Sequence, residues 1–216
     1  KSILDAITAQ FGLEYPKQLL DYYSEEMSQS AAAIEAYNAG KYCMDFLEDN
    51  KDIEQSKVHF EKAITLDNNF VEAYYLYGLA CHRLGNYDAA EIALLKGQEI
   101  AEEKNNLQGL AYICKGFSIL YDDRGMWGKS IRNIEKALKI QIQLNNNTVE
   151  AMLRFDYAGY LNHQGETDLS IEQNKQAGKL LKNLEDDRLF GISCGILTDS
   201  YLIKGDYTQS IEYGKK

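Results

Sequence analysis

The sequence of 216 residues has a single proline, Pro16, and no apolar stretch long enough to cross a bilayer. One proline leaves the rest of the chain without the residue that most often breaks helices. A spanning helix needs about 20 apolar residues, and the start of the chain shows no signal-peptide core. We therefore expect a helix-rich protein that does not associate with membranes.

Cysteine is also scarce. Cys43, Cys81, Cys114 and Cys194 lie far apart, and none belongs to a CxxC pair. This spacing disfavours both a disulfide framework and a zinc site, and it fits reduced, buried thiols. The predicted location is the cytoplasm.

Basic residues are outnumbered, with 23 Lys and Arg against 33 Asp and Glu, a formal net charge of -10 and a pI near 4.9. Nucleic-acid binding requires clustered cations that displace counterions from phosphates. We therefore expect no nucleic-acid partner.

Catalytic signatures are missing as well. The three histidines, His59, His82 and His163, stand far apart, and no HExxH, GxxxxGK or GxSxG occurs. Paired acids such as Asp122 and Asp123 fall where helices are expected to end, where capping and solvation explain them. The chain is predicted to be no enzyme, with no cofactor and no metal site.

What the sequence does contain is a repeat. The hexamers GNYDAA, GMWGKS, GETDLS and GDYTQS begin at Gly85, Gly125, Gly165 and Gly205, 40 residues apart. Such a period is typical of stacked repeats. A glycine, a polar residue, an aromatic and a small residue suit a tight turn between antiparallel helices. Thr167 replaces the aromatic in one copy.

Apolar residues at helical spacing fill the segments between these turns. Asn-rich or acidic links separate the expected helix pairs, and such residues are typical of turns and helix caps. We expect an N-terminal helical lead-in over 1–30 and an array of about five helix pairs over 31–216, the last truncated. The expected helices run over 31–49, 52–66, 71–84, 87–102, 107–121, 127–144, 148–163, 169–184, 188–203 and 207–216.

The segment from about Ala36 to Lys216 resembles the tetratricopeptide repeat, in a variant with a 40-residue period rather than 34. The residues that carry the resemblance in one copy are Tyr74, Tyr77-Gly78, Cys81, Gly85, Tyr87, Ala90, Leu94 and Gly97, and in the next Tyr112, Lys115-Gly116, Ile119, Gly125, Trp127, Ser130, Ile134 and Ala137. The implied fold is all-α, a right-handed superhelical solenoid of antiparallel helix pairs. The sequences AIEAYNAGKYCMDF and FEKAITLDNNF also resemble the C-terminal repeats of bacterial nucleotidyl cyclases and TolB-like regulators.

In that family the first helix of each pair lines a concave groove. Carried onto this sequence, the resemblance implies a groove that binds a peptide or protein segment and is lined by Tyr75, Leu79, His82, Arg83, Ile113, Phe117, Tyr121, Phe155, Asp156, Asn162 and His163. The family's carboxylate clamp is predicted to be absent, because Tyr37 and Lys41, or Tyr75 and Leu79, stand at its leading positions. An alternative interpretation is that several of the apolar residues only pack against the next helix.

The sequence is compatible with two functional hypotheses. One is a non-catalytic interaction scaffold, the regulatory part of a larger signalling protein. The other is a peptide-sensing regulatory domain, or a self-association module that forms a homodimer through a terminal repeat. A sensor should tighten when its peptide binds, and the sequence does not separate the two hypotheses.

Overall fold

A computed structural model describes residues 28, 30–46, 50–182 and 187–215, and the expected lead-in helices over 1–27 lie outside these residues. All regular structure in the described part of the chain is helical. The helices are α3 (Ala31–Phe46), α4 (Asn50–Leu66), α5 (Val71–Arg83), α6 (Tyr87–Glu103), α7 (Leu107–Asp123), α8 (Trp127–Gln143), α9 (Asn147–His163), α10 (Thr167–Lys182), α11 (Asp187–Lys204) and α12 (Tyr207–Tyr213). The predicted fold class, an all-α helical repeat, is confirmed. We call α3, α5, α7, α9 and α11 first helices and the others second helices.

The joints explain the 40-residue period. From α6 to α9 each helix has 17 residues, and three residues connect it to the next. The middle residue of each joint has positive φ, either a glycine such as Gly125 (68°) or an asparagine such as Asn145 (55°). At Gly125 the N–H donates to Asp122, and the Met126 N–H donates to Tyr121. This is the Schellman pattern, which satisfies the last carbonyls of the helix.

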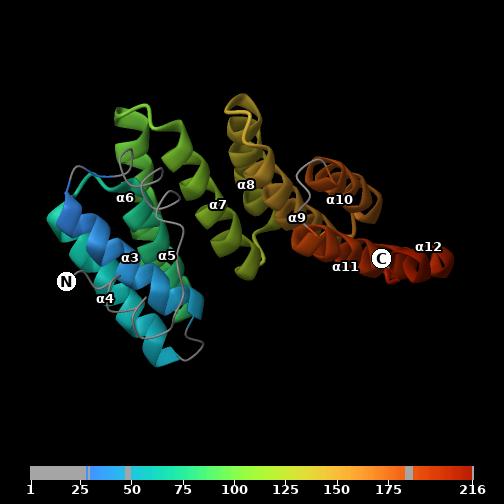
Figure 1. The fold of residues 1–216 in the computed structure, drawn as a ribbon, viewed down its shortest axis with the longest axis horizontal. Coiled ribbons are helices and arrows are strands. Elements are labelled where there is room, and N and C mark those ends of the chain that lie inside the picture. Colours follow the sequence, from blue (N-terminus) through green and yellow to red (C-terminus); the bar gives the residue numbers. More distant parts are fainter. Residues whose placement is uncertain (1–27, 29, 47–49, 183–186, 216) are drawn as a thin grey trace. The chain divides into compact units, whose positions relative to one another are not determined.

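The chain divides into two compact units, residues 1–116 and 117–216, with the boundary inside α7. In the first unit α3 packs on α4, α4 on α5, and α5 on α6 (Figure 1). Fully buried Phe60 and Phe70 fill the space between α3, α4 and α5. The ring of Tyr37 lies 4.9 Å from that of Phe70 and 5.9 Å from that of Phe60, which ties α3 to both clusters.

Close helix approach in this unit depends on Gly116 of α7. A Cβ on this residue would lie 2.6 Å from Cδ2 of Leu94 and 3.2 Å from Cδ2 of Tyr75. Carbon atoms do not approach that closely without rearrangement, so only glycine lets α7 pack against α5 and α6 in this way.

In the second unit α8 packs on α9, α9 on α10, α10 on α11, and α11 on α12. The residues buried in its apolar clusters are Ala151, Phe155, Ala177 and Leu181, and further along Ile171, Leu197 and Tyr201. Between α10 and α11 the packing is polar, since Asn174 and Ser193 are both buried and hydrogen-bond to each other.

Candidate functional site

An exposed stripe of α5 carries four of the residues predicted to bind a partner. Tyr75, Leu79 and His82 are half-buried and Arg83 is exposed. Tyr75 and Leu79 rest on the cluster around Phe60, and the Tyr75 ring stacks on Tyr112 of α7 with centroids 5.6 Å apart and planes at 21°. We call Tyr75, Leu79, His82, Arg83 and Tyr112 the α5 face.

Arg83 and His82, at the polar end of the α5 face, have few close contacts with the rest of the protein. Nη1 of Arg83 lies 3.4 Å from the carbonyl oxygen of Met44, and the exposed side chain extends to solvent. The His82 ring is tilted at 54° against Tyr87, 5.6 Å away. A guanidinium in this setting can donate to a carboxylate or carbonyl of a docked chain.

Tyr77 of α5 is half-buried and remains uncharged. Burial raises the pKa of Tyr77 to about 12, and the neighbouring Cys81 thiol, to which its hydroxyl is hydrogen-bonded, adds to the shift. Burial also raises the pKa of Cys81. Both groups are therefore neutral at physiological pH, and neither is activated for nucleophilic chemistry.

In the second unit, polar contacts link successive first helices. Nδ1 of His163 lies 3.1 Å from Oδ2 of Asp122, whose side chain is only 10% exposed. Nδ2 of Asn162 donates to Oγ of Ser200 at 3.0 Å. Tyr121 is half-buried and stacks on Phe117 at 5.8 Å, with Nζ of Lys129 5.0 Å from its ring centroid. Asp156 is half-buried on α9.

Three of the predicted groove residues lie in the chain's own core. Ile113 is 0% exposed, Phe117 3% and Phe155 7%, so these side chains are closed to a partner. The alternative interpretation, packing within the array, applies to them. The other eight residues keep exposed surface, and their role in binding stays a prediction.

The exposed stripe of α7 differs from the one expected by about one residue. Half-buried side chains recur at Gln108, Tyr112, Lys115, Ile119 and Asp122, at helical spacing. Sequence reasoning missed Tyr112 and Lys115 because α7 is apolar around most of its circumference. On α9 it likewise missed Met152, which is 40% exposed.

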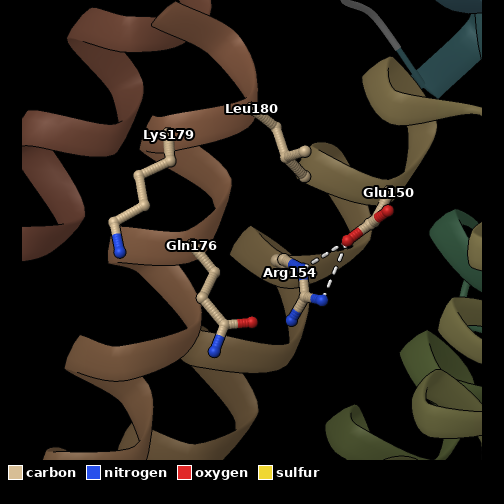
Figure 2. A pocket seen from close by; sticks show the side chains of 5 residues that line it. All are labelled: Glu150, Arg154, Gln176, Lys179 and Leu180. Atoms are coloured by element: carbon tan, nitrogen blue, oxygen red, sulfur yellow. Dashed lines mark hydrogen bonds and ion pairs between the residues drawn. The ribbon is translucent and has the colours of Figure 1, made fainter.

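A pocket of about 240 Å³ lies between α9 and α10, away from the predicted residues. Figure 2 shows Glu150 and Arg154 extending from α9, and Gln176, Lys179 and Leu180 from α10. Nε and Nη2 of Arg154 donate to Oε1 of Glu150 at 2.9 and 2.8 Å, and Nη1 donates to Gln173 at 2.6 Å. The guanidinium thus pairs with Glu150 within α9 and joins α9 to α10 through Gln173.

The part of the chain that the structure describes contains no cluster of three or more His, Cys, Asp or Glu side chains placed to hold a metal ion. Its four cysteines are buried thiols that form no disulfide with one another.

Among the helices of the described residues, none combines the length and the apolar character that crossing a membrane requires.

Comparison with known families identifies tetratricopeptide repeats in the first unit. Two models of the tetratricopeptide repeat match residues 59–92 and 45–70. Residues 45–92 are therefore similar to tetratricopeptide repeats. A comparison with curated proteins gives no sequence match, and the narrower resemblance to nucleotidyl cyclases or TolB-like regulators gains no support.

Solved structures share the fold. The structure of a signal transduction ATPase with a tetratricopeptide repeat sensor from Pyrococcus horikoshii aligns with a TM-score of 0.77 and 18% identity, over 99% of this chain and 32% of that protein. The structure of BtubC from P. vanneervenii aligns with a TM-score of 0.65 and 13% identity, over 85% of this chain and 87% of that protein. The apo form of RapI aligns with a TM-score of 0.67 and 16% identity, over 91% of this chain and 54% of that protein.

Proposed function

We propose that this chain is a non-catalytic interaction module that binds a peptide or protein segment on the exposed faces of its first helices. The observation that carries the proposal is the α5 face, where stacked Tyr75 and Tyr112 adjoin Leu79 and end at Arg83. Tyrosine and arginine are among the residues that are enriched in protein interfaces and that contribute most of their binding energy. In the second unit we propose a separate binding face, formed by Tyr121, Asp156, Asn162 and His163 within that unit.

The module is proposed to serve as the regulatory or sensing part of a larger protein in the cytoplasm. In the ATPase of similar fold the repeats are named a sensor, and the aligned region is about a third of that protein. The four buried thiols fit a reducing compartment. The polar contacts between first helices, such as His163 with Asp122, would let a bound segment tighten neighbouring pairs.

A random peptide library displayed on phage tests the proposal. Peptides selected on the wild-type chain should lose at least tenfold in affinity for Arg83→Glu, because this variant reverses the charge at the end of the α5 face. A matched control is Val58→Ser, since Val58 is 60% exposed on α4. Equal binding of the selected peptides to Arg83→Glu and wild type, or no enrichment at all, would contradict the proposal.

A further inference from the structure

A basic stripe runs along the outward side of α8. Lys129, Arg132, Lys136 and Lys139 are all exposed, and their spacing places them on one side of the helix. The one acidic residue of α8, Glu135, accepts a hydrogen bond from the Tyr157 hydroxyl of α9 at 2.5 Å, so it is engaged beside the stripe. We call the four cations the basic face.

The outward side of α6 has the opposite charge. Asp88, Glu99, Glu102 and Glu103 are exposed and Glu91 is half-buried, whereas Lys96, the single cation of the helix, is bound to Glu99 at 2.6 Å. We call these five acids the acidic face. Between them Ile92 is 68% exposed and Leu95 54%. These two aliphatic side chains give the acidic face an apolar centre that a docked helix can cover.

We propose that the basic face of one copy of this chain docks against the acidic face of a second copy. The acidic face is long enough to cover the basic face, because the 15-residue step from Asp88 to Glu103 spans about 22 Å of helix and the 10-residue step from Lys129 to Lys139 about 15 Å. The aliphatic stems of Arg132 and Lys136 can cover Ile92 and Leu95 while their charges reach the acids.

The net charge of -10 does not prevent this association. At physiological ionic strength the screening length is about 8 Å, so distant like charges are screened more strongly than opposite charges in contact. The surface differs from the α5 face, because both faces lie on second helices, although Lys129 contacts a residue of the proposed binding face in the second unit, Tyr121. Self-association through them leaves the α5 face available.

Sedimentation velocity over a concentration series tests the proposal. A pair of copies joined by one such contact leaves one basic and one acidic face open for further copies. The wild-type mass should therefore rise with concentration at 50 mM salt, and the apparent affinity should fall about tenfold or more at 500 mM salt. Arg132→Gln/Lys139→Gln and Glu99→Gln/Glu103→Gln should each remain monomeric. An equimolar mixture of the two variants should form a species with one copy of each, because each supplies the face that the other lacks.

A mixture that stays monomeric would overturn the proposal, as would association that neither variant weakens. The result stays interpretable, because the substituted side chains are exposed and circular dichroism can verify folding. If the wild-type chain is monomeric at all concentrations but its basic face binds poly-glutamate, the face takes some other acidic chain, and self-association is ruled out.

Discussion

Asn174 and Ser193 are joined by two hydrogen bonds inside the second unit. Nδ2 of Asn174 donates to the Ser193 carbonyl at 2.8 Å, and Oγ of Ser193 donates to Oδ1 of Asn174 at 3.3 Å. Asn174 is 0% exposed and Ser193 1%. Steps of 40 residues lead back from Asn174 to Ile134 and Leu94, and from Ser193 to Leu153 and Ile113. In the two earlier repeats both of these positions are apolar, whereas here both are polar.

This replacement predicts strong coupling between the two positions. Asn174→Leu should lower the free energy of unfolding by about 1–3 kcal/mol, because it leaves the buried Ser193 hydroxyl without its partner. Asn174→Leu/Ser193→Ile should recover most of that loss, since removing both polar groups leaves none unsatisfied. Urea unfolding of the two single variants and the double variant measures the coupling free energy between the two positions. If the two single changes in unfolding free energy simply added up in the double variant, the prediction would be contradicted.

Two glutamates in the same V-E-A sequence should respond to amide substitution with opposite signs. Burial raises the pKa of Glu72, Asp67 adds to the shift, and a hydrogen bond from Asn106 opposes it. Among the described residues no partner reaches Oε2 of Glu72. Glu150 instead is paired with Arg154.

The sign for Glu72 follows from proton linkage. Its folded-state pKa lies above the unfolded value of about 4.3, so its favourable contribution is complete below that pH and is lost as pH rises through the raised pKa. Glu72→Gln should therefore be more stable than wild type at pH 7, with the difference shrinking toward acidic pH. Thermal unfolding across pH measures this, and a difference independent of pH would contradict it.

Glu150→Gln is the matched comparison. It removes the charge that Arg154 contacts where both side chains are nearly buried, 11% and 12% exposed, and should destabilise by about 1–3 kcal/mol at pH 7. If Glu150→Gln were neutral, the ion pair would have no structural role.

Gly125 and Gly128 should also respond to alanine with opposite signs. An added Cβ meets nothing within 4 Å at either residue, but Gly125 has φ of 68° whereas Gly128 is helical. Gly125→Ala should destabilise by about 1–2 kcal/mol through its left-handed backbone. Gly128→Ala should stabilise by about 0.5–1 kcal/mol through helix propensity. Thermal unfolding of both variants measures these changes in stability. If both variants were less stable than wild type, the explanation from backbone conformation would be wrong.

Phe117→Ala should act on folding rather than on binding. The ring is 3% exposed and stacked on Tyr121, so its removal should lower the free energy of unfolding by about 3–5 kcal/mol. Peptides selected on the wild-type chain should bind the folded fraction of the variant unchanged. If Phe117→Ala bound these peptides more weakly without being less stable, Phe117 would be part of the binding surface after all.

The sequence alone determined the helices and their joints. Glycine or asparagine at a fixed 20-residue step, as at Gly125 and Asn145, sets where each helix ends, because few other residues adopt positive φ. The expected bounds of α5 to α9 agree with the structure to within two residues. These features are local, so local sequence specifies them.

Only the tertiary structure decided which side of each first helix faces solvent. The α7 sequence LQGLAYICKGFSILYDD is apolar nearly all round, so its periodicity does not distinguish an outward Tyr112 from a buried Phe117. Neighbouring helices decide that choice, through close contacts such as that of Leu94 at Gly116. The same holds for Asn174, since its polarity is explained only by the Ser193 that packing brings beside it.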